Sequence, residues 1–142
     1  MMTKAPPFAM TRASGPEGTM LTLAFCLLSL TALLGLVLAG LHLQAGRTRP
    51  PRWPVWALHG SLGLVGFIIL LLCLGGPPRG AALGLANFGR FAAVLLGVAL
   101  LAAAEILFER LRHHRLPVLM AGLHATLAIG AVIVLAAYTL LG

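Results

Sequence analysis

Two histidines lie within apolar stretches of this 142-residue chain, each a short distance after a proline. His59 follows Pro54 by five residues, and His124 follows Pro117 by seven. A neutral imidazole is a common metal ligand, and two imidazoles at one depth on different helices could supply both axial ligands of a haem. Ionisable groups cost free energy in lipid, so both histidines are expected to face a bundle interior and are candidates for function.

Small residues follow both histidines at helical spacing, four and seven positions further along the chain. They are Gly63 and Gly66 after His59, and Ala128 and Ala131 after His124. Residues at these spacings share one face of a helix. One interpretation is room for a flat macrocycle held edge-on between the two helices. The other is close packing of helices through small residues, with the histidines hydrogen-bonded across the interface.

A second pair of ionisable residues suggests a metal site. His42 lies five residues before Arg47, and Glu105 lies five before Arg110, so both sit roughly 7–10 Å inside one end of their helices. Together with the first two histidines they would form a three-histidine, one-carboxylate set that suits zinc, iron or copper. The alternative for His42 is an interfacial polar residue that reaches the headgroups.

The chain repeats part of its sequence at a spacing of 63 residues. The clearest matches surround an arginine- and proline-containing segment, and apolar residues upstream match at the same spacing. The matched pairs are Arg47/Arg110, Arg49/Arg112, Arg52/Arg115, Pro54/Pro117, Val55/Val118, Phe25/Phe88, Leu33/Leu96, Leu38/Leu101 and Ala39/Ala102. His42 and Glu105 also correspond at this spacing, and Leu58-His59 aligns with Leu123-His124 after a two-residue insertion. The pattern predicts two tandem two-helix repeats of parallel topology.

The composition is that of a membrane protein. Sixty per cent of the residues are hydrophobic, 9% are charged, and the mean hydropathy is +1.01. Four runs, residues 19–43, 55–74, 86–108 and 117–141, have about the 20 apolar residues that cross a bilayer. Since lipid leaves no partner for unpaired backbone groups, each run is expected to be a helix. The predicted fold is an all-α four-helix transmembrane bundle.

The organisation along the chain is simple. Residues 1–18 are predicted to form a flexible tail, and residues 19–142 a single membrane domain. The first repeat covers about 19–79 and the second about 80–142. A glycine- and proline-rich segment at 75–80 marks the turn between them.

The basic residues predict the orientation. Six arginines fall at the end where the first and third helices finish: Arg47, Arg49, Arg52, Arg110, Arg112 and Arg115. The opposite end carries four basic residues, so the arginine-rich loops are expected in the cytoplasm and both termini outside. The expected location is a bacterial inner membrane, with the arginines contacting anionic lipid. The net charge of +7 comes without any nucleic-acid-binding motif, so nucleic acid is not an expected partner.

The helix count, together with His59 and His124, resembles the membrane domains of b-type cytochromes, including the cytochrome b561 type. That resemblance implies a haem b held by two histidines inside the bundle. This chain has one such pair where a cytochrome b561 has more, so one haem is implied. The chain is also similar to small uncharacterised four-helix proteins of bacterial membranes, a likeness that implies no activity.

Two functions follow as hypotheses. The first is an electron-transfer protein or subunit with one haem b between the second and fourth helices. The second is a non-catalytic accessory subunit of a larger membrane complex, in which histidines and small residues pack helices and arginines contact lipid or a partner. Either way the chain is expected to act with other membrane subunits, as an electron carrier or accessory subunit rather than an enzyme. With three acidic residues and no catalytic motif, it offers little to a hydrolase.

Overall fold

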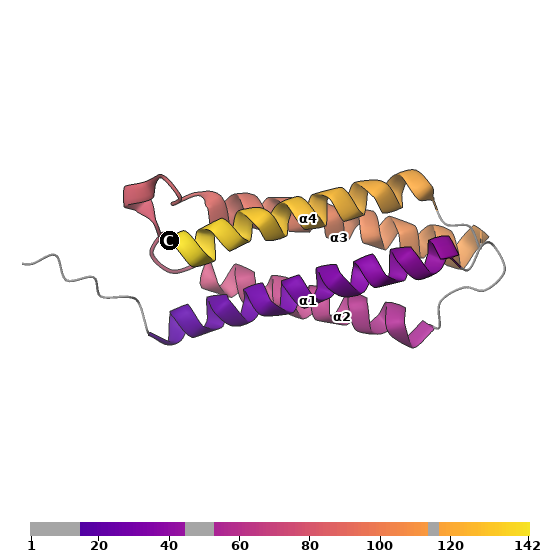
Figure 1. Ribbon diagram of the computed structural model, residues 1–142, viewed down its shortest axis with the longest axis horizontal. Coiled ribbons are helices and arrows are strands. Elements are labelled where there is room, and N and C mark those ends of the chain that lie inside the picture. Colours follow the sequence, from indigo (N-terminus) through magenta and orange to yellow (C-terminus); the bar gives the residue numbers. More distant parts are fainter. Residues whose placement is uncertain (1–14, 45–52, 114–116) are drawn as a thin grey trace, which may run out of the picture.

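The computed structural model describes residues 15–44, 53–113 and 117–142, and this part of the chain is helical throughout its length apart from short turns. The four long helices are α1 (Pro16–Gln44), α2 (Trp53–Cys73), α3 (Phe88–His113) and α4 (Val118–Leu141). A short 3₁₀ helix, η2 (Ala81–Leu83), lies between α2 and α3. The predicted all-α four-helix bundle is confirmed, and no strand occurs in the described ranges (Figure 1).

Prolines and glycines set the helix boundaries. Pro16 and Pro54 lie in the first turns of α1 and α2, where a missing N–H breaks no intrahelical hydrogen bond. Gly80 and Gly84 flank η2 with φ angles of 65° and 73°, a left-handed conformation that suits residues without a Cβ. This is the predicted turn between the halves. The sequence placed the start of α1 three residues late and the end of α3 five residues early, because charged end turns lower the local hydropathy.

The helices form two antiparallel hairpins, α1/α2 and α3/α4, which lie side by side (Figure 1). Packing is more extensive within each hairpin than between them, where α1 contacts α4 and α2 contacts α3. The pairs α1/α3 and α2/α4 therefore lie across the diagonals of the bundle. Helix α1 begins and helix α4 finishes at the same end of the molecule. At the other end, here called the arginine end, α1 and α3 finish and α2 and α4 begin.

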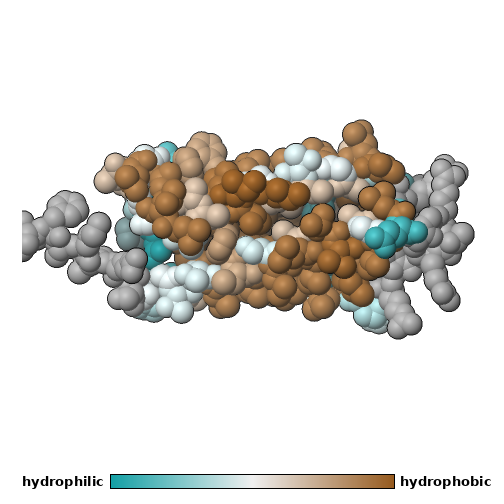
Figure 2. Space-filling model, viewed as in Figure 1, coloured by the Kyte–Doolittle hydropathy of each residue, from teal (hydrophilic) through white to brown (hydrophobic). Residues whose placement is uncertain are grey.

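The surface of the bundle is apolar over its length. All four helices are long and apolar enough to cross a membrane, as in an integral membrane protein. Large aliphatic side chains such as Leu36, Leu72 and Leu101 are two-thirds or more exposed. Figure 2 shows hydrophobic residues covering the middle of the visible face, with the most hydrophilic ones nearer its ends. An outward apolar surface of this extent is expected where lipid replaces water.

The buried faces of α1 and α3 do not follow the 63-residue spacing. That spacing pairs Leu38, 4% exposed, with Leu101, 73% exposed, and Leu33, 61% exposed, with the buried Leu96. A spacing of 68 residues instead pairs buried positions with buried positions along both helices. These pairs are Leu21/Gly89, Ala24/Ala92, Leu28/Leu96, Thr31/Ala99 and Leu38/Ile106.

For α2 and α4 the buried faces correspond at 65 residues, the spacing expected from the two histidines. Gly66 corresponds to Ala131 and Leu70 to Leu135, and all four are buried. The two hairpins thus bury equivalent positions, in a register that differs from the loop match for the first helix of each. His42 and Glu105, paired at 63 residues in the sequence, are not equivalent in this register.

Candidate functional site

The histidine pair lies between the two hairpins, nearer the arginine end than the middle of the bundle. The ring centroids of His59 on α2 and His124 on α4 are 6.1 Å apart, with an angle of 78° between the ring planes. Both side chains are half-buried. Because α2 and α4 lie on a diagonal, the two imidazoles approach each other across the interface between the hairpins.

Each histidine is held by the other helix of its own hairpin. His59 Nδ1 lies 3.0 Å from the backbone oxygen of Thr31, and His124 Nδ1 lies 2.8 Å from that of Ala99. A carbonyl oxygen only accepts, so Nδ1–H donates in both cases and a neutral ring keeps its lone pair on Nε2. Within the described residues, neither Nε2 has a hydrogen-bond partner. An Nδ1–H bond to a backbone carbonyl is the usual second interaction of a metal-ligating histidine.

Small residues on the facing helix allow this close approach. A Cβ added to Gly35 would lie 2.9 Å from Cε1 of His59, which is closer than two carbons can sit. Gly35 is one turn beyond Thr31, and Ala103 is one turn beyond Ala99, so the two positions correspond. The first hairpin needs a glycine there, whereas the second accommodates a methyl group.

A cavity of about 80 Å³ surrounds the two rings, and all four helices line it. Gly63 and Ala128, one turn after each histidine, line this cavity, as do Gly60 and Ala103. The other two residues of the predicted small-residue faces, Gly66 and Ala131, are not among its lining residues.

Gly66 and Ala131 pack in the core instead. A Cβ on Gly66 would lie 2.9 Å from Cγ of Leu28, and Ala131 is fully buried in the hydrophobic cluster. In the predicted small-residue faces, the residues nearest each histidine, Gly63 and Ala128, line the cavity, and those one turn further, Gly66 and Ala131, pack against other helices.

His42 and Glu105 do not join the pair. Within the described ranges, no three histidine, cysteine or acidic side chains lie close enough to share a metal ion. Glu105 is exposed on the outside of α3, and His42 is half-buried near the end of α1. Of the predicted four-residue metal set, only His59 and His124 lie close together in the described part of the chain.

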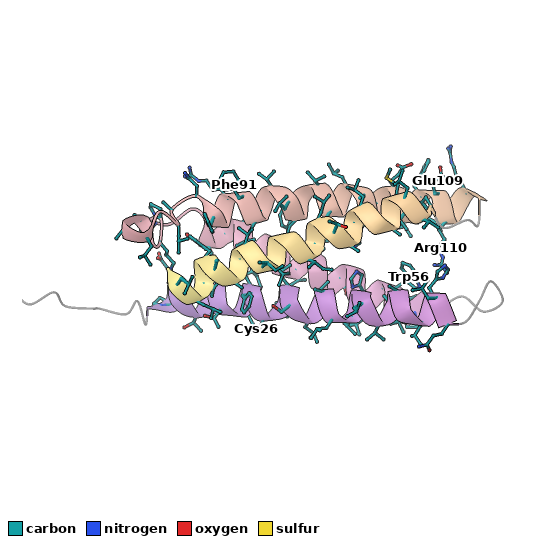
Figure 3. The ribbon with its side chains drawn as sticks, turned by 45° about the horizontal axis from the view of Figure 1, so that its top comes forward. Cys26, Trp56, Phe91, Glu109 and Arg110 are labelled. Atoms are coloured by element: carbon teal, nitrogen blue, oxygen red, sulfur yellow. The ribbon has the colours of Figure 1, made fainter. Side chains whose placement is uncertain are left out.

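Two of the six arginines at the arginine end are described, and both lie over aromatic rings. The guanidinium carbon of Arg110 is 4.6 Å from the centroid of a Trp56 ring, and that of Arg112 is 4.4 Å from the centroid of Phe108. Figure 3 shows Trp56 and Arg110 close together at that end of the bundle. The remaining four, Arg47, Arg49, Arg52 and Arg115, lie outside the described residues.

Sequence reasoning did not find the partners of these side chains. The acceptors at Thr31 and Ala99 are backbone atoms that carry no residue-type signal. The contact between Trp56 and Arg110 depends on how α2 meets α3, which no spacing within one helix reveals.

The chain matches no family model, no curated protein and no solved structure in three comparisons.

Proposed function

We propose that this integral membrane protein binds one haem b through His59 and His124 and transfers electrons, either alone or as a subunit of a membrane complex. The observation that carries the proposal is the pair of imidazoles 6.1 Å apart, each oriented by an Nδ1–H bond to a backbone carbonyl. Two metal–nitrogen bonds of about 2 Å each, plus about 1 Å from each nitrogen to the centre of its own ring, give a centroid distance of about 6 Å. The separation of the two rings is therefore compatible with both imidazoles binding one metal ion.

The room for a macrocycle depends on the interface between the hairpins. The cavity of about 80 Å³ is smaller than the roughly 300 Å³ at which small-molecule pockets begin. This cavity therefore does not hold a macrocycle as it stands, and a haem would bind only after the helices around the two rings rearrange. The packing between the two hairpins is the less extensive packing of the bundle, so such a rearrangement would involve that interface.

A haem in this position would supply one-electron chemistry, and the protein would supply ligands and surroundings. His59 and His124 would hold the haem iron, each through Nε2. The carbonyls of Thr31 and Ala99 hold each ring in the tautomer that presents Nε2. These features favour an electron carrier over an oxygen-activating enzyme.

The test is an absorption spectrum of the purified full-length protein produced with haem supply, recorded oxidised and after dithionite reduction. A low-spin b-type spectrum is expected, and it should disappear in His59→Ala and in His124→Ala because the iron loses an axial ligand. His42→Ala is the matched control, since this third histidine stands apart from the pair and its loss should leave the spectrum unchanged. A wild-type protein without a haem spectrum would contradict the proposal.

The second candidate function is an accessory membrane subunit that binds no cofactor. The observation favouring it is that each histidine bonds the neighbouring helix of its own hairpin, which by itself stabilises helix packing. In that case, replacing either histidine would lower the unfolding temperature while wild type showed no haem absorption. The same preparations decide between the two functions.

For location we propose a bacterial inner membrane with the arginine end in the cytoplasm, supported by the excess of arginine at that end. Lipid headgroups and other membrane subunits are the proposed partners. The test uses a variant lacking Cys26 and Cys73, with a single cysteine placed at Gln44 or at Pro78. An impermeant thiol reagent added to intact cells should label the Pro78 position only, and labelling of the Gln44 position only would reverse the orientation.

A further inference from the structure

The contact between Trp56 on α2 and Arg110 on α3 brings two hydrogen-bond donors together. The indole Nε1 of Trp56 is buried and has no hydrogen-bond partner in the described part of the chain. The guanidinium carbon of Arg110 lies 4.6 Å from the centroid of a Trp56 ring, and such a cation–π contact leaves the guanidinium N–H groups free to donate. A buried N–H without an acceptor is costly, and a guanidinium favours an anionic one. Both donors therefore call for an oxyanion.

The acidic residues of the chain are poorly placed to be that acceptor. Only three are present in the sequence. Glu17 lies in the first turn of α1, at the opposite end of the bundle, and Glu105 is exposed on α3. Glu109 directly precedes Arg110 in α3, so the two side chains leave the helix about 100° apart. The described helices thus leave the two donors to a ligand.

Both residues lie where lipid headgroups are expected. Trp56 is in the first turn of α2, which begins at Trp53, and Arg110 is in the last turn of α3, which ends at His113 (Figure 3). Tryptophan and arginine at the ends of membrane helices lie at the headgroup level. Helical side chains lean toward the helix N-terminus, so the indole also lies beside the partial positive charge of that first turn. The oxyanions available at this level are lipid phosphates.

We propose that Trp56 and Arg110 bind the phosphate of one anionic phospholipid, at the edge of the arginine end where α2 meets α3. One phosphate oxygen accepts a hydrogen bond from the indole Nε1–H. Another accepts from the guanidinium, which turns toward the phosphate and uncovers the edge of the indole. The inference rests on the proposed lipid partners and names their binding site. It does not use His59 or His124, so a protein without a haem spectrum would leave it standing.

The first test observes the indole N–H directly. The chain has two tryptophans, so full-length protein labelled with ¹⁵N-tryptophan in phosphate-free maltoside micelles gives two indole signals, which Trp53→Phe assigns. Added phosphatidylglycerol should move the Trp56 indole proton signal downfield, because the N–H gains a charged acceptor. A phosphate-free galactolipid should not move it. The signal of Trp53, which is 78% exposed, should respond alike to both lipids.

The second test measures the dissociation constant of phosphatidylglycerol in the same micelles. Trp56→Phe and Arg110→Gln should each weaken binding about tenfold, because each removes a hydrogen bond to a charged group. Trp53→Phe is the matched control for the indole. Arg112→Gln is the control for the guanidinium, since Arg112 lies over Phe108 of its own helix. Both controls should bind the lipid as wild type does.

A soluble competitor decides the source of the phosphate. Inorganic phosphate and glycerophosphoglycerol, the headgroup without acyl chains, should not displace the lipid even in large excess. Displacement accompanied by the same indole shift would assign the site to a soluble phosphate and overturn the lipid assignment.

Two further results would overturn the inference. One is a Trp56 indole signal that stays in place while phosphatidylglycerol binds. The other is equal weakening in all four variants, which would show general attraction of the lipid rather than a site. The indole measurement leaves Trp56 and Arg110 unchanged, so it decides the matter even if neither of their variants folds.

Discussion

The two hairpins make the same contact with different side chains. In the first, His59 on α2 bonds the carbonyl of Thr31; in the second, His124 on α4 bonds the carbonyl of Ala99. One turn further along, the first hairpin has Gly35 against the ring and the second has an alanine. The position of the imidazole is therefore the same in both hairpins, while the small residues that make room for the ring differ.

At the opposite end of the hairpins, large and small residues are interchanged between corresponding positions. Leu21 on α1 corresponds to Gly89 on α3, and Cys73 on α2 corresponds to Tyr138 on α4. A Cβ on Gly89 would lie 2.8 Å from Cε1 of Tyr138 and 2.6 Å from Cδ2 of Leu74. The larger residue of each pair is therefore Leu21, on the first helix, in the α1/α2 hairpin, and Tyr138, on the second helix, in the α3/α4 hairpin. Volume is conserved across the pair rather than at each position, as close packing requires.

The largest expected effect comes from breaking this interchange of large and small residues. Gly89→Leu should destabilise the protein by about 3 kcal/mol, because the added side chain overlaps Tyr138 and Leu74. Adding Tyr138→Cys, which restores the arrangement of the first hairpin, should recover part of that loss. Unfolding in detergent followed by circular dichroism measures both, and an additive double variant would mean that the two positions do not compensate.

An intermediate effect is expected beside the histidines. Gly35→Ala should cost about 2 kcal/mol, because the new methyl group meets Cε1 of His59. The converse change, Ala103→Gly, should cost only about 1 kcal/mol, mainly through the lower helix propensity of glycine. Unfolding free energies of the two variants measure the difference. Equal costs would show that the two rings occupy similar space in both hairpins.

The smallest effect is expected from Thr31. Its side chain bonds Leu27 O in its own helix, while the histidine uses its backbone oxygen. Thr31→Ala makes the first hairpin like the second and should change stability by less than about 1 kcal/mol. The spectrum of a haem-loaded sample should also stay the same. A loss of low-spin absorption in this variant would show that the threonine side chain, rather than the carbonyl, positions the ring.

Much of the fold could be predicted from the sequence because lipid allows few solutions. Four long apolar runs had to be helices in lipid. Because their number is even, the start of α1 and the end of α4 lie at the same end of the bundle. The histidine pair could also be predicted, since His59 and His124 interrupt apolar helices at the same register.

The register of the first helices could not be predicted, for a physical reason. In a membrane bundle, residues facing lipid and residues facing the core are both apolar, so matches such as Leu33 with Leu96 carry no information about facing. The 63-residue spacing came mainly from the loop arginines and prolines, which need not keep the register of the helices that precede them. Thr31 and Ala99 occupy corresponding positions because the backbone carbonyl of each accepts a hydrogen bond from the histidine of its hairpin. These contacts join residues far apart in the sequence, so spacing within one helix does not reveal them.

The central claim, that one histidine from each hairpin binds the same iron, is tested most directly by electron paramagnetic resonance of the ferric protein. A low-spin signal from a single haem per chain is expected in wild type. Conversion to a high-spin signal, or loss of haem, is expected in His59→Ala and in His124→Ala alike, with low-spin character restored by added imidazole where haem is retained. A low-spin signal that survives either replacement without added imidazole would contradict it.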